Sequence, residues 1–372
     1  MALTNFAALT ADQKMVWSKD LWQAARDLTF INKFTGGSDA VVQRITELTK
    51  TERGELVIMH LLADLVDDGV IGDNEREGNE EEMMTYNQKI TIDLISHGVR
   101  QKGKLAEQKT VVNFRENAKD RLAYWLANRM DQLAFLTLSG ISYAFANNGA
   151  ARTSGAFNTL AFAANVTAPS AKRGLVWSAT AGLKSTFQGY TNATLLATDT
   201  LTYKAIVDLT VYAKTHYVKP LNVGGKEYYV CFIRPEGLAQ LKKDDNYQRA
   251  VTNLALKDGT NSPWFTGGIV TIDGLVFHEH RLLYTTLGAA DGSKWGSGAG
   301  GHVDGSRLLL CGPQALGFAD LGAPEWSEKW FNFDSSPGVN IDKMFGFLKP
   351  VFYSIYDKTT EDFGVVTVDF AI

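Results

Sequence analysis

Cysteine is scarce in this chain: its 372 residues contain only Cys231 and Cys311. A disulfide framework is therefore excluded, and this cysteine usage fits a reducing compartment. Each cysteine lies in an apolar run, which predicts a buried and unreactive thiol. The chain has only six histidines in addition to the two cysteines, so it offers few ligands for a structural zinc site.

The sequence also lacks an excess of basic residues and any long hydrophobic run. Its 37 Lys and Arg residues against 41 Asp and Glu residues give a net charge of −4. Proteins that bind nucleic acid through its phosphates usually carry an excess of positive charge, so this balance does not indicate such binding. No apolar run approaches the ~18–20 residues of a membrane span, and no signal peptide is visible, so we expect no membrane association. With 45% hydrophobic and 21% charged residues, the composition indicates a folded globular protein.

Motifs that carry chemistry are absent or incomplete. The chain has no G-x-S-x-G elbow, no Walker lysine loop and no H-E-x-x-H. Residues 296–301 match G-x-G-x-x-G, but their flanks predict loop where a dinucleotide site needs a strand and a helix. His278 and His280 share one face of a predicted strand and would need His302 as a third zinc ligand. We therefore expect no enzymatic activity, no cofactor and no metal.

One segment is strongly acidic. Residues 65–82 hold eight acids and one arginine, a net charge of −7, between two runs in which apolar and polar residues alternate. This pattern predicts an extended β-hairpin over residues 54–104 with an acidic tip. The spacing from Asp73 resembles the start of a calcium loop, but Met84 stands where the bidentate glutamate should be, which disfavours calcium.

The next segment reverses the charge. Residues 100–129 hold eight bases and three acids, a net charge of +5. Apolar residues at a spacing of three and four predict one helix over residues 105–139, roughly 50 Å long, that ends at Gly140. Because the hairpin would project away from its own helix, we expect its acidic tip to meet the basic helix of a neighbouring subunit.

The rest of the chain predicts a helical arm, an irregular stretch and then an α/β region. The arm covers residues 1–35 and carries Trp17 and Trp22, which we expect a partner surface to cover. The small and polar residues of 141–200 predict irregular loop with marginal secondary structure. Further elements are expected as a helix at 201–217, a strand at 228–234, a helix opened by Pro235, a hairpin turn at 273–274, and strands at 307–311, 351–356 and 364–372.

Several segments, in this order and spacing, resemble one protein family. They are residues 54–58, 69–73, 77–81, 92–93, 234–235, 241–244, 263–268, 273–274, 278–281 and 308–315, together with the long helix. The chain resembles the major capsid proteins of tailed bacteriophages, those related to podoviruses that carry a virion RNA polymerase. This resemblance spans roughly residues 35–370.

The resemblance implies the α+β fold of tailed-phage and herpesvirus capsids, the Johnson fold. It implies an N-terminal arm at residues 1–35 and an extended loop at 50–105. A peripheral domain would comprise residues 36–49, 106–199 and 331–372, with the helix 105–139 as its spine. An axial domain would comprise residues 200–330.

The implied function is that of a major capsid protein. Pentamers and hexamers would form an icosahedral lattice around packaged double-stranded DNA, with only non-specific contact to that DNA. The protein would be part of the virion and would assemble in the host cytoplasm. Its implied partners are a portal and a separate scaffolding protein, and some capsids of this kind also bind a decoration or cement protein. The alternative is an encapsulin-like compartment shell, which uses the same fold.

The expected inter-subunit contacts are the two arm tryptophans, the acidic tip and the basic face of the helix. They are Trp17, Trp22, Asp73, Glu75, Glu77, Glu80, Glu81, Glu82, Arg115, Lys119, Arg121 and Arg129.

Overall fold

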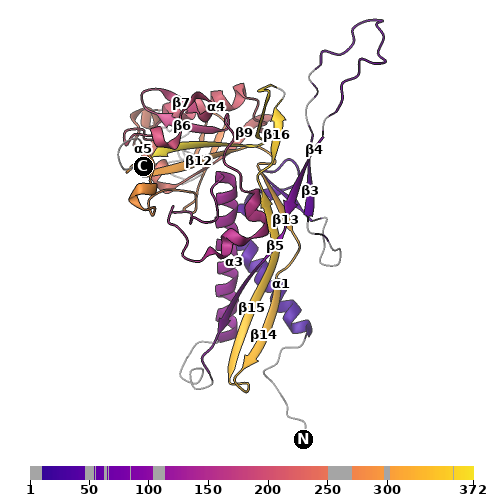
Figure 1. Ribbon diagram of the computed structural model, residues 1–372, viewed down its shortest axis with the longest axis vertical. Helices are drawn as coiled ribbons and strands as arrows, with labels where there is room; N and C mark the ends of the chain where they lie inside the picture. Colours follow the sequence, from indigo (N-terminus) through magenta and orange to yellow (C-terminus); the bar gives the residue numbers. More distant parts are fainter. Residues whose placement is uncertain are drawn as a thin grey trace.

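The chain forms an elongated half and a compact half at one end of it, with a loop that stands away from both (Figure 1). The computed structural model describes residues 11–46, 54, 56–62, 65, 67–83, 85–103, 114–249, 270–296, 302–354 and 356–372. None of the helices in these ranges is long and apolar enough to cross a membrane.

The compact half is built around an eight-stranded mixed sheet in the order β10-β11-β9-β12-β18-β6-β7, with β8 paired to β9. The strands are Val270–Ile272, Leu275–Glu279, Lys226–Ile233, Gly305–Cys311, Val365–Ala371, Gly174–Ser178 and Gly182–Ser185 in that order, and β8 is Leu221–Val223. Every residue of β12 and β18 is buried, as the apolar character of these central strands predicts. Helices α4 (Tyr203–Thr215) and α5 (Pro235–Lys243) bury Leu209 and Leu241 in the same core.

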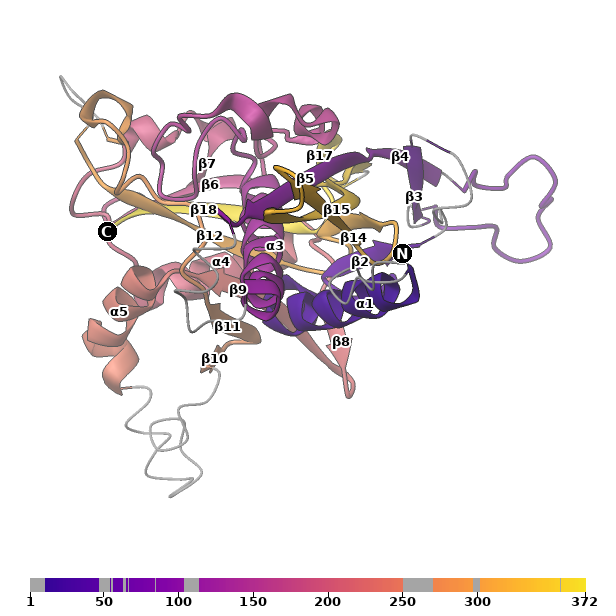
Figure 2. The same cartoon turned by 90° about the horizontal axis from the view of Figure 1, so that it is seen from below.

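The elongated half holds a six-stranded sheet in the order β1-β2-β13-β15-β14, with β5 paired to β15. The strands are Thr35–Gly36, Val42–Ile45, Leu316–Asp320, Ser336–Leu348, Glu325–Phe331 and, for β5, Asp93–Arg100. Helices α1 (Ala11–Leu28) and α3 (Phe114–Ser139) lie side by side along this sheet (Figures 1 and 2). The 3-10 helix η1 (Ile31–Phe34) leads from α1 into β1.

Helix α3 connects the two halves. Its last turns, from Leu133 to Leu138, are buried, whereas its first turns alternate between buried and exposed residues. The predicted end is confirmed, because Gly140 takes a left-handed φ of 65° directly after the helix. Helix α3 is 26 residues long, or roughly 39 Å. The expected start near residue 105 lies outside the described residues.

The hairpin predicted between residues 54 and 104 is present as a two-stranded ribbon. Strands β3 (Leu56–Leu62) and β4 (Thr85–Thr91) pair antiparallel. The alternation in β3 buries Val57, Met59 and Leu61 in a small core with Leu348 and Phe363. The apolar residues on the other face, Leu56, Ile58 and Leu62, are exposed. The returning run continues into β5, which leaves the ribbon and joins the main sheet through β15.

The expected domain boundaries need correction. The expected peripheral segments include strands β6, β7 and β18. In the structure these three strands belong to the eight-stranded sheet, whose other strands come from residues 200–330. Strands β13 and β14 were assigned to the axial domain, yet they pair with β15 in the elongated half. The reason is that the chain crosses between the two sheets several times, so neither sheet is made from one continuous segment.

Most local predictions after residue 200 are confirmed. Helix α4, strand β9, and α5 with Pro235 in its first turn lie where the pattern placed them. Asp273 and Gly274 form the hairpin turn, both with positive φ. The strand expected at 351–356 is β16 (Val351–Ser354), which pairs with β17 (Thr359–Asp362). Cys231 and Cys311 are buried and free, and burial raises the pKa of both thiols.

Candidate functional site: an acidic loop and a basic helix

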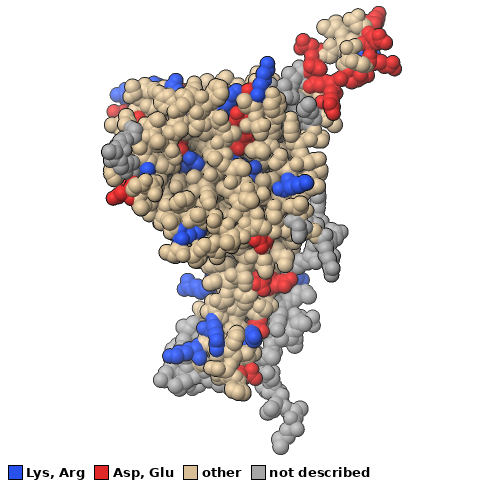
Figure 3. All heavy atoms as spheres, viewed as in Figure 1, with Lys and Arg blue, Asp and Glu red and all other residues tan. Residues whose placement is uncertain are grey.

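Residues 67–83 connect β3 to β4 and form the loop that stands away from the body; they are called the acidic loop below. Asp and Glu side chains crowd this loop in the space-filling view (Figure 3). Of the predicted contact residues in it, Asp73, Glu75, Glu77, Glu80 and Glu82 are exposed, and Glu81 is partly buried.

Two glutamates shape the acidic loop from within. The backbone N–H of Gly78 donates to Glu80 Oε2 at 2.8 Å, and the N–H of Asp67 donates to Glu81 Oε2 at 2.9 Å. Within the described part of the chain, the carboxylates of Asp73, Glu75 and Glu77 accept no hydrogen bond and form no ion pair. The far end of the loop therefore presents three acids that no described residue neutralises.

The predicted basic residues lie on α3. Arg121 is exposed, Lys119 is partly buried, and Arg129 is half-buried two turns farther along the helix. The side chain of Arg115 lies outside what the structure describes. The acidic loop of the same chain lies far from the start of α3, which is at the lower end of the elongated half while the loop stands at the opposite end of the view (Figure 1).

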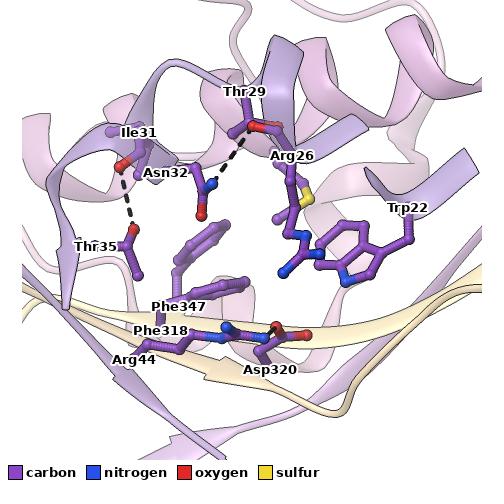
Figure 4. A pocket seen from close by; sticks show the side chains of 11 residues that line it. Trp22, Arg26, Thr29, Ile31, Asn32, Thr35, Arg44, Phe318, Asp320 and Phe347 are labelled. Carbon is purple, nitrogen blue, oxygen red and sulfur yellow. Dashed lines mark hydrogen bonds and ion pairs between the residues drawn. The ribbon is translucent and has the colours of Figure 1, made fainter. Parts of the chain in front are cut away.

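Trp22 is covered by its own chain, so the expectation that a neighbouring subunit covers it is wrong. Its side chain is only 7% exposed. The Lys343 ammonium lies 3.9 Å from its ring centroid and the Arg26 guanidinium 5.7 Å. Trp22 lines a small pocket with Arg44, Phe318, Asp320 and Phe347, where Arg44 pairs with Asp320 (Figure 4). The side chain of Trp17 lies outside what the structure describes.

The arm is tied to α3 by a buried carboxylate. Asp131 Oδ2 accepts the backbone N–H of Phe30 at 2.9 Å, and Oδ1 accepts that of Ile31 at 3.0 Å. These two bonds satisfy the backbone where α1 gives way to η1. Burial raises the pKa of Asp131 to about 6, and the two backbone bonds and Lys33 oppose that rise.

A second basic feature lies beside α3, and sequence reasoning missed it. Arg129 of α3 and Arg152 of the following loop line a groove of about 410 Å³, together with His97, Trp125 and Phe157. This feature is called the arginine groove below. The guanidinium carbons of Arg129 and Arg152 lie 5.9 Å and 4.9 Å from the Phe157 ring centroid. The His97 and Trp125 rings stack at 4.4 Å.

The two arginines of the groove lack a carboxylate partner within the described residues. Arg152 Nε donates to the backbone oxygen of Phe145 at 3.1 Å, while its Nη2 is buried without a hydrogen-bond partner. Burial lowers the pKa of Arg129. Burial and repulsion from Arg129 lower the pKa of Arg152. Arg129 Nη1 donates to Gln132 Oε1 at 2.5 Å. Two guanidinium groups at one groove can also donate charge-assisted hydrogen bonds to an anion.

The histidines considered as zinc ligands are part of an aromatic core. His280 stacks on Phe30 at 4.3 Å and on Phe135 at 5.1 Å, and His278 meets the Phe34 ring edge-on at 4.7 Å. Burial, then the charges of Arg281 and Lys33, lower the pKa of His280 to about 4. No group of three or more His, Cys, Asp or Glu side chains in the described ranges is arranged to hold a metal ion.

The glycine motif and the calcium-like loop give no support to a ligand site. Of residues 296–301, only Gly296 is described, and the next described element is strand β12, where a dinucleotide site needs a helix. Met84, at the last position of the calcium-like loop, lies outside the described residues.

Comparison with known proteins agrees with the sequence resemblance. The sequence model of a family described as phage capsid protein matches residues 5–372. The major capsid protein of Pseudomonas phage KPP25 is 48% identical over 370 residues, which cover 98% of this chain and 96% of that protein. The solved capsid of Ralstonia phage GP4 superposes with a TM-score of 0.74 at 26% identity, covering 92% of this chain and 91% of the other. The capsid of cyanophage Pam1 gives 0.68 at 17% identity and covers 100% and 96%.

Proposed function

Because this chain belongs to the phage capsid protein family and is a major capsid protein of the icosahedral phage head, we propose that the acidic loop of each subunit lies over helix α3 of a neighbour. The observation that carries the proposal is the loop itself. It bears a net charge of −7 over residues 65–82 and stands away from the body of its own chain (Figures 1 and 3). Its exposed acids Asp73, Glu75 and Glu77 form no ion pair with any described residue. Arg121 on α3 presents an exposed charge of opposite sign.

The protein is a structural component of the virion and not an enzyme, and its subunits form a homo-oligomeric shell. We infer that the shell consists of pentamers and hexamers around double-stranded DNA. Its partners would be a portal and a separate scaffolding protein, and the shell could also bind a decoration or cement protein. The net charge of −4 supports weak, non-specific contact with that DNA.

The fold family implies a peripheral domain and an axial domain, and the two halves of the chain are candidates for them. We infer that the elongated half, with α3 as its spine, is peripheral and that the compact half is axial, near the centre of each ring. The finer placement among podoviruses that carry a virion RNA polymerase stays a prediction that rests on the sequence segments alone. The alternative of an encapsulin-like compartment has no support, since the family and the relatives are phage capsid proteins.

The proposed contact gains its strength from repetition. A single exposed ion pair contributes ~0–1 kcal/mol, so one loop on one helix would bind weakly. A subunit held at several sites at once is bound much more tightly, because each further contact forms intramolecularly. Loss of the loop contact is therefore expected to lower the yield of closed particles without unfolding the subunit.

The test reverses the charge of three adjacent acids, in the variant Glu80→Lys, Glu81→Lys, Glu82→Lys. Assembled particles, measured by sedimentation and electron microscopy, should fall in yield while the circular dichroism of the unassembled subunit stays that of wild type. The triple change to Gln keeps acceptor oxygens for the N–H groups of Gly78 and Asp67, so it separates the charge from the shape of the loop.

We expect an intermediate yield from the Gln variant. A reversal of three exposed acids elsewhere, Asp39, Glu227 and Asp245, controls for the overall change of charge. If the Lys variant assembles as well as wild type, the loop-to-helix proposal is wrong.

A further inference from the structure

We propose that the arginine groove receives the far end of a neighbour's acidic loop, with the carboxylates of Asp73, Glu75 and Glu77 seated against Arg129 and Arg152. This inference rests on the proposed function, and it names the residues that meet. Its occupant is a second copy of this chain.

The groove is suited to carboxylates. Guanidinium groups donate paired hydrogen bonds to a carboxylate, and this geometry makes arginine the preferred partner for such groups. Neither Arg129 nor Arg152 has a carboxylate partner among the described residues, so a carboxylate in the groove would meet guanidinium charges that no described acid balances. The rings of Trp125 and Phe157 form apolar walls, which lower the local dielectric and strengthen a charge-assisted bond.

The loop end offers the matching groups. Glu80 and Glu81 are engaged in shaping the loop, whereas the carboxylates of Asp73, Glu75 and Glu77 are unpaired within the described residues. Ile71, which is 77% exposed, lies next to them and supplies an apolar side chain for the aromatic walls. Gly72 and Gly78 both take positive φ, so the backbone turns on either side of this acidic end.

The shape of the molecule excludes occupation from within. The acidic loop projects away from the elongated half, while Arg129 lies on α3 (Figure 1). The charges on the two features are opposite, and among the described residues Asp73, Glu75 and Glu77 on the loop and Arg129 and Arg152 in the groove form no ion pair. A neighbour's loop would therefore bring acids of the loop end against the two arginines of the groove in a single contact.

A charge-exchange experiment tests the pairing. Arg129→Glu with Arg152→Glu, and separately Asp73→Lys with Glu75→Lys and Glu77→Lys, should each lower particle yield about tenfold or more, because each places like charges together. The five changes combined should restore most of the yield. A combined variant that assembles no better than either half would overturn the inference, provided that each half-variant keeps wild-type circular dichroism.

A crosslinking experiment keeps the inference testable if the groove variant does not fold. Glu75→Cys with Ser154→Cys places one thiol on the loop end and one at the groove, and the buried Cys231 and Cys311 do not compete. Assembled particles should give covalent multimers on oxidation. The matched pair Glu75→Cys with Arg121→Cys should crosslink at a clearly lower yield, because Arg121 lies two turns away from Arg129 on α3.

The outcomes separate this inference from the proposal on which it rests. Crosslinking only through Arg121→Cys would mean that the loop lies on α3 but outside the groove, so the proposed function would stand and the inference would fall. No crosslink from either pair, with normal assembly of the Glu80–82 lysine variant, would overturn both. Particles of the groove variant that assemble normally but hold less DNA would assign the groove to phosphates instead, which also overturns the inference.

Discussion

At the scale of single residues, Phe30 contacts two titratable groups, the buried Asp131 and the half-buried His280, whose contributions to stability depend on pH in opposite directions. Asp131 accepts its backbone N–H, and His280 stacks on its ring. The pKa of Asp131 is raised to about 6, so its neutral form is favoured in the fold and its contribution to stability is lost as the pH rises through 6. The pKa of His280 is lowered to about 4, so its contribution is present above the ordinary histidine pKa and is lost as the pH falls through 4.

We predict that Asp131→Asn removes one of these two effects. The free energy of unfolding of wild type, relative to the variant, should fall by on the order of 2–3 kcal/mol as the pH rises from about 3.5 to 6.5. The cause is that only wild type must bury a charge at the higher pH. Urea unfolding of the unassembled subunit at a series of pH values measures this difference. A difference that does not change with pH would show that the Asp131 carboxyl ionises as freely in the fold as in water.

The surroundings of two residues, Trp22 and Arg152, could not be predicted from the sequence. The burial of Trp22 depends on Lys343, which lies more than three hundred positions away in the chain, so the tryptophan alone suggested a partner that it does not need. Arg152 lies in the small, polar stretch 141–200, where no periodicity marks any position. Arg152 lies in the same groove as Arg129 because of the path that the loop takes after α3, and nothing in the sequence indicates that these two arginines are close together.

At the scale of elements, local patterns predicted α3, α4, β9 and α5, because a helix or a buried strand is specified by residues close together in sequence. The face of β3 was not predictable. Alternation shows that two faces exist, but Leu348 and Phe363 decide which one is buried. The same holds for β5, whose partner β15 lies more than two hundred residues farther along the chain.

The end of α3 provides a second prediction about stability. Gly140 has a φ of 65°, and a Cβ there would lie 2.4 Å from the backbone oxygen of Thr167 and 2.9 Å from Pro169 Cδ. Gly140→Ala should lower the free energy of unfolding by more than about 2 kcal/mol, since strain and steric overlap add.

Gly189 supplies the matched control for that change. It also has positive φ, 84°, but nothing lies within 4 Å of a Cβ at that position. Gly189→Ala should therefore show the backbone strain alone, about 1 kcal/mol. Chemical unfolding of both variants measures the two losses. Equal losses would mean that the helix end is not held against residues 167–169 as described.

At the scale of the whole molecule, the proposed contact joins two charged features that the described residues leave unpaired. The acidic loop projects from the body at net −7 over residues 65–82, and the arginine groove faces outward with two uncompensated guanidinium groups. In a closed shell of identical subunits, every loop can meet a neighbour's groove, so every groove can receive carboxylates and part of each loop's charge is neutralised. This arrangement explains why a chain of near-neutral charge keeps its acidic and basic residues in separate segments.

The most direct test is an electron cryomicroscopy reconstruction of assembled particles at a resolution that shows side chains. The account predicts that residues 67–83 of each subunit run over helix α3 of the next subunit, with density joining the loop end to Arg129 and Arg152. A loop that folds back over its own subunit, or that faces solvent with the arginine groove empty or filled by another segment, would contradict it.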